Sequence, residues 1–109
     1  MKRHPVAIEA GAEADLEEIV TFIAGRESIE RALAVATQIE QAIGRLASFP
    51  ERGPHPRELL EHGVRDYREV TWKPYRILYR MAGETVVVVL IADGRRDMRG
   101  LLARRLLGA

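Results

Sequence analysis

The stretch that decides the fold is YREVTWKPYRILYRMAGETVVVVLIADGRRD, residues 67–97. It contains three strand-like runs separated by short turns at residues 73–74 and 83–84. The last run, Thr85 to Ala92, is almost entirely β-branched, which is typical of a central strand that is covered on both faces. Such a strand needs neighbours on both of its edges and helices above it. The stretch therefore predicts an antiparallel meander whose final strand lies inside a sheet.

The middle run alternates with a period of two residues. Arg76, Leu78 and Arg80 fall on one face of it, and Tyr75, Ile77, Tyr79 and Met81 fall on the other. This alternation predicts two guanidinium groups side by side on one surface of the sheet.

The residues before the meander predict a strand followed by two helices. Val6 and Ile8 alternate like a short strand, and an apolar stripe with helical spacing begins around Ala12. Ser28 is a favourable N-cap for a second helix, which we expect to continue until Phe49-Pro50.

A Pro/Gly-rich loop follows the second helix, and we expect Leu59 and Leu60 to pack this loop against the rest of the domain. The next strand is predicted from Val64 to Trp72. Met98, Leu101, Leu102 and Leu106 predict a short C-terminal helix.

Composition restricts the class of protein. The 109 residues are 47% hydrophobic and 30% charged, as in one globular domain, and no apolar run approaches the roughly 20 residues that span a bilayer. There is no cysteine, which fits a reducing cytoplasm, and three scattered histidines do not form a metal-ligand cluster. We expect a cytoplasmic protein with no metal, no cofactor and no membrane association.

The charge is distributed unevenly along the chain. Residues 1–50 carry five Lys or Arg against eight Asp or Glu, whereas residues 51–109 carry twelve against eight, and eleven of those twelve cations are arginine. Arginine pairs in a planar, bidentate way with carboxylates and phosphates, so an acidic partner is one interpretation. The other is that these side chains are simply solvated, and charge alone does not decide between the two.

The order of elements and several short motifs together resemble the ParE/RelE toxin superfamily, and the ParE branch in particular. The resemblance covers nearly the whole of residues 1–109, which we expect to form a single toxin domain. It implies an α+β fold in which an N-terminal strand and an antiparallel helical hairpin pack on an antiparallel β-sheet (β-α-α-β-β-β), followed by a short C-terminal helix. The motifs are Ala14-Asp15-Leu16 at the start of the first helix with Ile19 and Phe22-Ile23, the segment from Leu46 to Pro50 after the second helix with Gly53, Tyr67-Arg68, Tyr75-Arg76-Ile77 with Tyr79, and Gly94-Arg95-Arg96-Asp97.

The resemblance implies a toxin of a type II toxin–antitoxin module, held inactive in a hetero-oligomer by a ParD-like antitoxin. The ParE branch poisons DNA gyrase and blocks replication, whereas the RelE branch cuts messenger RNA on the ribosome. We favour gyrase inhibition, which is not enzymatic and needs no specific nucleic-acid binding by the toxin alone. The alternatives are a metal-independent, RelE-like endoribonuclease and a non-toxic member that acts only in a repressor complex.

RNA cleavage without a metal requires side chains that act as a general base and a general acid. Arginine stays protonated, so it stabilises negative charge but does not act as the general base. After Asp97 the chain has no Tyr, His or Lys, and the loop that carries basic catalytic residues in RelE-like enzymes has Glu51-Arg52. We therefore assign no catalytic residue. The predicted target-binding residues are Arg68, Arg76, Arg80, Arg95 and Arg96, of which Arg68 and Arg76 could equally pair with Asp66, Glu69 or the carboxylates of the first helix.

Antitoxins of this family carry a disordered segment that folds on the toxin as a helix and an acidic extended stretch. Such a segment needs apolar side chains that stay exposed on the isolated toxin. We predict that Leu33, Leu60 and Leu102 contribute to this surface. For Leu59 and Leu101 we prefer a place in the core of the toxin itself.

Overall fold

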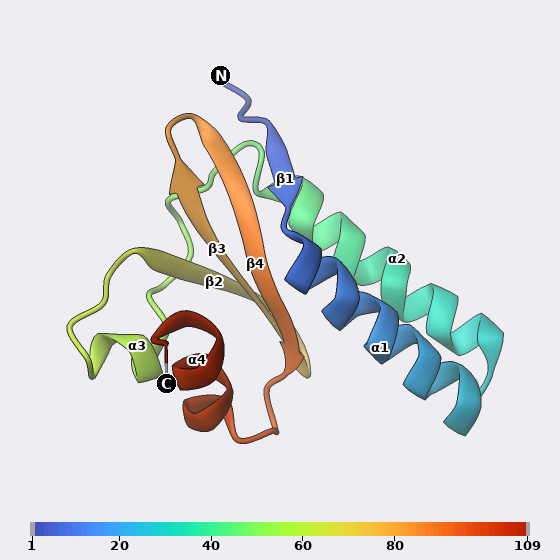
Figure 1. Cartoon of the computed structure of the whole chain (residues 1–109). Coiled ribbons are helices and arrows are strands. Elements are labelled where there is room, and N and C mark those ends of the chain that lie inside the picture. The colour runs from blue at the N-terminus through green and yellow to red at the C-terminus, as the bar shows by residue number, and fades with distance from the viewer. Residues whose placement is uncertain (1, 109) are drawn as a thin grey trace.

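The computed structural model describes residues 2–108 and contains a four-stranded sheet with helices on both faces (Figure 1). The fold class predicted from the sequence is confirmed. The elements in chain order are β1 (Val6–Ile8), α1 (Ala10–Arg26), α2 (Ile29–Arg45), α3 (Arg57–Leu60), β2 (Tyr67–Trp72), β3 (Tyr75–Ala82), β4 (Thr85–Asp93) and α4 (Met98–Leu106).

The sheet has the strand order β1-β4-β3-β2, so β4 has a neighbour on each side as its sequence predicted. β2, β3 and β4 form the predicted antiparallel meander, and β1 adds to β4 in parallel. The register of β3 and β4 shifts once, because Leu78 pairs with Leu90 while Tyr79 pairs with Val88, which leaves Val89 as a bulge. Val89 and Leu90 therefore pack into the same core cluster although they are consecutive.

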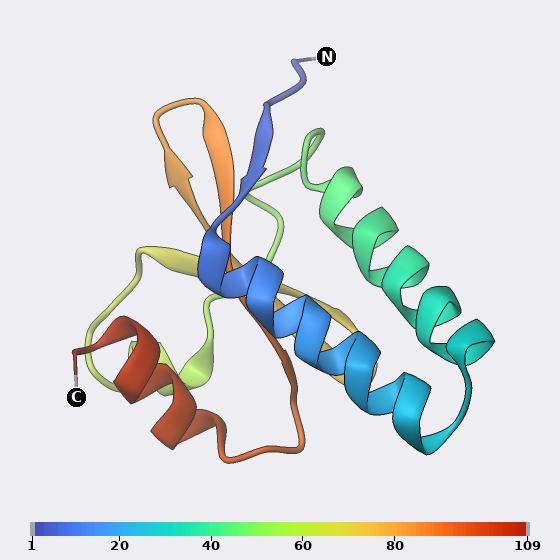
Figure 2. The ribbon, with the colours of Figure 1, turned by 45° about the vertical axis from the view of Figure 1, so that its right-hand side comes forward.

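Each face of the sheet has its own apolar core. The hairpin of α1 and α2 covers one face, where Ile39 and Val35 of α2 pack with Ile77 and Tyr79 of β3. α3 and α4 lie together beyond the other face, as Figures 1 and 2 show, and Leu59 and Leu102 pack there against Leu78. The alternation of β3 thus sends its odd-numbered residues to the hairpin and its even-numbered residues to α3 and α4.

Four element boundaries differ from the sequence-based predictions. α1 begins at Ala10 rather than around Ala12, directly after the Glu9 amide bonds to the Val88 carbonyl. α2 ends at Arg45, and tighter turns with i→i+3 hydrogen bonds carry the chain to Ser48. α3 was not predicted, because one helical turn has no periodicity to detect. β2 starts at Tyr67 because the Val64 amide instead bonds to Leu59, closing the turn after α3.

The predicted N-cap of α2 is confirmed, since the Ser28 hydroxyl oxygen accepts a hydrogen bond from the Arg31 amide at 3.0 Å. Among residues 2–108, no helix is long and apolar enough to cross a bilayer.

Candidate functional site

Arg76 lies at the centre of an ion cluster on the face that α3 and α4 cover. Its Nε donates to Glu69 Oε1 at 2.6 Å, while Nη1 and Nη2 donate to the two carboxylate oxygens of Glu58 at 2.9 and 2.8 Å. The Arg76 side chain is only 16% exposed, and both glutamates are similarly covered. The three short, charge-assisted contacts fix the guanidinium in one orientation.

The electrostatics of this cluster follow from the same contacts. The hydrogen bonds from Arg76 lower the pKa of Glu58 to about 2, and the hydrogen bond to Glu58 raises the pKa of Arg76. A phosphate or a foreign carboxylate would have to displace one of the two glutamates to reach Arg76. Pairing with Glu69 was one of the predicted structural roles, whereas the bidentate contact with Glu58 was not predicted.

The other two sheet arginines are each directed to a different partner. Arg68 Nη1 donates to the Gly53 carbonyl at 2.8 Å and holds the loop before α3 against β2. Arg80 Nη2 donates to Glu9 Oε1 at 3.1 Å, at the junction between β1 and α1. The prediction that the guanidinium groups of Arg76 and Arg80 lie side by side is therefore wrong, because each group binds carboxylates of a different part of the fold.

Arg95 and Arg96 lie in the exposed loop between β4 and α4. Arg95 contacts the Asp93 carboxylate through Nε at 2.9 Å and Nη2 at 2.6 Å, and its side chain remains 77% exposed. The hydrogen bonds from Arg95 lower the pKa of Asp93. The exposed Arg96 has no carboxylate partner within 4 Å anywhere in residues 2–108. The loop therefore presents one loosely paired and one unpaired guanidinium to solvent.

A hollow of about 420 Å³ lies beside this loop, between α1 and the ends of β3 and β4. Phe22 and Tyr75 contribute its aromatic surface, and Arg95 and Arg96 line it on the loop side. Burial raises the pKa of the Tyr75 hydroxyl, so this group stays protonated at neutral pH and remains a hydrogen-bond donor.

The three predicted antitoxin-binding leucines do not share one environment. Leu33 on α2 is 59% exposed and Leu60 at the end of α3 is 38% exposed, whereas Leu102 is 1% exposed. The expected exposure of Leu102 is wrong, because α4 turns this residue into the core beneath the sheet together with Leu101. Leu59 is fully buried in the same cluster, so the core roles preferred for Leu59 and Leu101 are confirmed.

Two further exposed apolar residues belong to the helical hairpin. Phe22 near the end of α1 is 61% exposed, and Ile29 at the start of α2 is 63% exposed. Ile29 and Leu33 are four residues apart, so they lie one above the other on the same side of α2. The sequence did not lead us to assign either residue to an exposed apolar surface, because helical periodicity identifies the buried stripe and not the apolar positions beside it.

The histidines contribute no metal site. Nδ1 of His55 lies 2.8 Å from the Tyr67 carbonyl, an acceptor, so this nitrogen carries the proton and donates it. Across the described residues, no three His, Cys, Asp or Glu side chains come close enough together to hold a metal ion.

Comparison with known proteins gives a consistent result. Residues 6–98 match the family described as ParE toxin of type II toxin–antitoxin system, parDE. The chain is 32% identical over 91 residues to Toxin ParE3 of Caulobacter vibrioides (strain ATCC 19089 / CIP 103742 / CB 15). This alignment covers 84% of the chain and 87% of that protein.

Two solved structures resemble the fold. A chain of the chromosomal ParDE toxin–antitoxin system from P. aeruginosa superposes with a TM-score of 0.70 at 19% identity, over 84% of this chain and 96% of that one. The toxin–antitoxin complex RelBE2 from Mycobacterium tuberculosis gives a TM-score of 0.57 at 27% identity, over 85% of this chain and 93% of that one. With the family match across almost the whole described chain, these comparisons show that the protein belongs to the ParE family and is a toxin of a type II toxin–antitoxin system.

Proposed function

We propose that this toxin inhibits DNA gyrase in the bacterial cytoplasm, blocks replication, and is neutralised by a ParD-like antitoxin. The observation that carries the proposal is the match of residues 6–98 to the ParE family. Membership of this family implies gyrase as the target. The similarity to Toxin ParE3, which extends over 91 residues, supports the same assignment. The mode of action is binding to another enzyme, so it needs an exposed recognition surface and no proton-transfer group.

The loop between β4 and α4 is the best target-binding surface among the predicted arginines. Arg96 has no ion-pair partner within residues 2–108, and Arg95 keeps most of its side chain in solvent. Binding a partner through these two residues requires no buried ion pair to break. Arg76, by contrast, would have to abandon Glu58 or Glu69, which makes it a structural residue in this proposal.

The same arrangement disfavours RNA cleavage. A metal-free ribonuclease needs a base for the 2′-hydroxyl and free cations for the developing charge on phosphorus. Here the arginine at the centre of the sheet face is neutralised by two carboxylates. The segment from Met98 to the end of α4 contains no Tyr, His or Lys.

The exposed apolar side chains support an antitoxin surface on the helical hairpin and α3. Leu33 and Ile29 form a two-residue apolar ridge on α2, and Leu60 is a separate exposed position on α3. An antitoxin helix that laid its apolar side chains on the α2 ridge would cover surface that is costly to leave in water.

The test is a supercoiling assay with purified, antitoxin-free toxin, gyrase, ATP and relaxed plasmid. Loss of supercoiling, or linear plasmid recovered after protease treatment, is the expected result. Addition of the antitoxin encoded beside the toxin should restore supercoiling. Unchanged gyrase activity with a folded toxin that still arrests growth would reject gyrase as the target.

A RelE-like ribonuclease is the second candidate, and the observation that favours it is the similarity to the RelBE2 complex at 27% identity. Its signature would be new transcript ends at codon boundaries in cells that express the toxin. Mapping of 5′ ends before and after induction therefore separates the two activities.

A further inference from the structure

The hollow of about 420 Å³ beside the Arg95-Arg96 loop has walls of opposite charge. Glu18 and Glu27 line it on the side of α1, and Arg95 and Arg96 line it on the side of the loop. The residues of α1, β3 and β4 between these walls are mostly apolar. Pockets of this volume hold small organic molecules. The hollow therefore offers separate places for a group of N–H donors, an apolar ring and an anion.

Three of the four carboxylates in the lining already contact an arginine of the toxin. These pairs are Asp15 with Arg105, Asp93 with Arg95, and Glu27 with Arg31. Glu18 is exposed and has no arginine, lysine or histidine nitrogen within 4 Å among residues 2–108. The wall on α1 therefore presents one carboxylate whose two oxygens can accept hydrogen bonds from a ligand.

The loop provides the matching cation. Arg96 is exposed and has no carboxylate within 4 Å in the described part of the chain. Arg95 holds Asp93 through Nε and Nη2, which leaves its Nη1 available to a ligand. A phosphate bound here would receive charge-assisted hydrogen bonds from two guanidinium groups without breaking an ion pair. One unpaired carboxylate and one unpaired guanidinium thus stand on different walls of the hollow.

Phe22 gives the hollow an exposed aromatic surface. It is 61% exposed, and the guanidinium carbon of Arg26 lies 5.1 Å from the centre of its ring. Tyr75, in the same lining, stacks on Trp72 with ring centres 6.2 Å apart and an angle of 7° between the planes. Nucleobases stack on aromatic side chains of this kind. A planar heterocycle that packed on Phe22 would cover apolar surface that the fold leaves in water.

We propose that the hollow binds a guanosine 5′-monophosphate unit. The guanine edge lies on Glu18, the base packs on Phe22, and the phosphate contacts Arg96 and Arg95. Tyr75 supplies a further hydroxyl donor for the ribose phosphate. This site goes beyond the proposed function, because it is a property of the toxin without gyrase.

The carboxylate of Glu18 determines which base fits. Guanine presents its N1–H and 2-amino groups side by side, so two donors face the two carboxylate oxygens. Adenine and cytosine present a ring nitrogen with a lone pair beside the amino group, and this lone pair repels a carboxylate oxygen. A carboxylate on this wall therefore selects guanine over adenine and cytosine.

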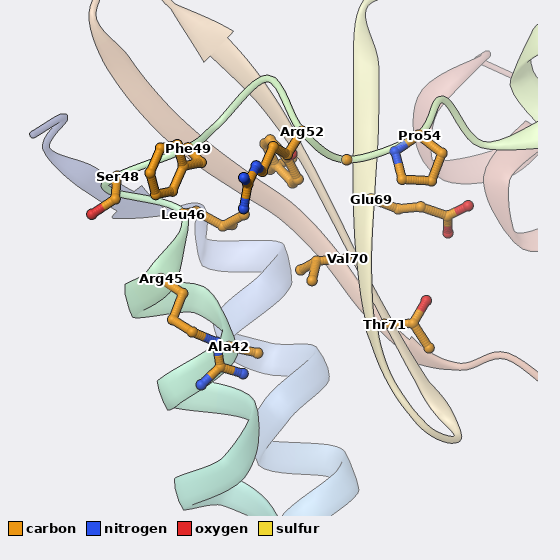
Figure 3. A pocket seen from close by; sticks show the side chains of 12 residues that line it. Ala42, Arg45, Leu46, Ser48, Phe49, Arg52, Pro54, Glu69, Val70 and Thr71 are labelled. Carbon is orange, nitrogen blue, oxygen red and sulfur yellow. The ribbon is translucent and has the colours of Figure 1, made fainter. Parts of the chain in front are cut away.

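A larger groove elsewhere on the toxin lacks this pattern of charge. Its volume is about 730 Å³, and Figure 3 shows it between the C-terminal end of α2, the loop after it and β2. Arg45 and Arg52 line this groove without a carboxylate partner among residues 2–108. Glu69, its one carboxylate, is bonded to Arg76. No carboxylate is left for a base edge in its lining, so we expect no preference for guanine there.

The experiment titrates the full-length toxin, labelled with ¹⁵N, with GMP, and calorimetry measures the affinity. Amide shifts are expected in residues 18–23 and 92–96. GMP should bind about tenfold more tightly than AMP and than guanosine, because each comparator loses one of the two polar contacts. Absence of binding, equal affinity for GMP and AMP, or shifts confined to the larger groove would overturn the proposal.

The variant Glu18→Gln tests the base edge. Glutamine presents a carbonyl oxygen and an amide N–H side by side, which matches the amino group and ring nitrogen of adenine. The variant should therefore lose the preference for GMP and bind AMP at least as tightly. Glu17→Gln, at an exposed glutamate outside the hollow, should keep the preference of the parent. An unchanged preference in Glu18→Gln would contradict the proposal.

The variant Arg96→Ala tests the phosphate contact. It should weaken binding of GMP by about tenfold and leave binding of guanosine unchanged. Arg45→Ala, at an exposed arginine of the larger groove, is the control and should bind GMP like the parent. Undiminished binding of GMP by Arg96→Ala would show that the phosphate does not lie on the loop, and the proposal would fail. Both arginines are exposed, and thermal unfolding confirms that each variant is folded.

The guanylate can be a free nucleotide or the 5′ end of a nucleic acid strand. A 5′-phosphorylated trinucleotide that begins with guanine separates these sources. Tighter binding than GMP assigns the site to a strand end, and weaker binding assigns it to the free nucleotide. All of these measurements use the toxin alone, so a failure here is distinguishable from a failure of gyrase inhibition, which the supercoiling assay detects.

Discussion

Arg76 and the Arg95-Arg96 loop use the same side chain in opposite ways. Arg76 is covered by α3 and has all its donor nitrogens engaged by Glu58 and Glu69. Arg96 is exposed and unpaired within residues 2–108, and Arg95, whose side chain is 77% exposed, has Asp93 as its single carboxylate partner. The difference shows that the role of an arginine in this fold is decided by the carboxylates that the tertiary structure brings to it.

The energetic consequences of the two settings are also opposite. Removing Arg76 leaves two partly buried carboxylates facing each other, which costs both their lost hydrogen bonds and their mutual repulsion. Removing Arg95 or Arg96 leaves nothing buried and unpaired. The comparison therefore predicts that mutations divide into those that affect folding and those that affect recognition.

The largest effect is expected for Arg76→Ala. The change should lower the unfolding free energy by roughly 3 kcal/mol, because Glu58 and Glu69 lose their shared partner. Urea denaturation followed by circular dichroism measures it. Arg65→Ala, at an exposed arginine, is the matched control and should stay within about 0.5 kcal/mol of the parent. A fully stable Arg76→Ala protein that had lost toxicity would reverse the comparison and make Arg76 a recognition residue.

Asp15 and Arg105 extend the comparison to a second structural arginine. Asp15 accepts hydrogen bonds from the Ile91 amide and from Arg105, and Arg105 also donates to the Val89 carbonyl at the bulge. These side chains satisfy the edge of β4 beyond the point where the three-residue β1 ends. Gly11 leaves the space, since a Cβ there would lie 2.9 Å from Arg105 Nη2.

We expect Asp15→Ala to lower the unfolding free energy by about 2 kcal/mol, because the change removes a charged acceptor from a backbone amide and a partner from Arg105. Hydrogen exchange should show the largest loss of protection at Ile91 and in α4. Glu17→Ala on the same helix, at an exposed position, is the control. Loss of protection spread evenly over the chain would show that Asp15 does not fix α4 locally.

These contacts mark the limit of what the sequence predicts. The β-branched run of β4 indicated a central strand because a strand covered on both faces needs apolar residues at every position. Ser28 predicted a helix start because its capping contact is local. Glu58 and Arg105 gave no comparable signal, because their partners are 18 and 90 residues away along the chain.

The leucines show the same limit on the apolar side. Leu101 and Leu102 are consecutive, and periodicity alone did not decide which of them faces the sheet. Both are buried, because α4 is covered by β3 and β4 on one side and lies next to α3 on another. Exposure of Leu33 was predictable, since it lies beside the buried stripe of α2 and not within it.

The Arg76 cluster also predicts a pH dependence. The pKa of Glu58 is lowered from its ordinary value of 4.5 to about 2 in the folded protein. Its contribution to stability is therefore complete above pH 4.5 and is lost as the pH falls towards 2. Glu58→Gln should remove about 1 kcal/mol of this dependence, allowing for solvent screening, as measured by urea midpoints between pH 2 and pH 6. An unchanged pH profile in this variant would show that other carboxylates cause the acid sensitivity.

The smallest change in stability, and the sharpest test of recognition, is expected for the double variant Arg95→Ala, Arg96→Ala. Arg95 makes only an exposed contact with Asp93, so the unfolding free energy should change by no more than about 0.5 kcal/mol. Growth arrest and gyrase inhibition should nevertheless be lost, while antitoxin binding through the hairpin is retained. Arg104→Ala, at another exposed arginine, is the matched control for lost charge. Because the double variant removes no buried partner, full toxicity in it could not be attributed to compensating changes in the fold, and it would move the target-binding surface away from this loop.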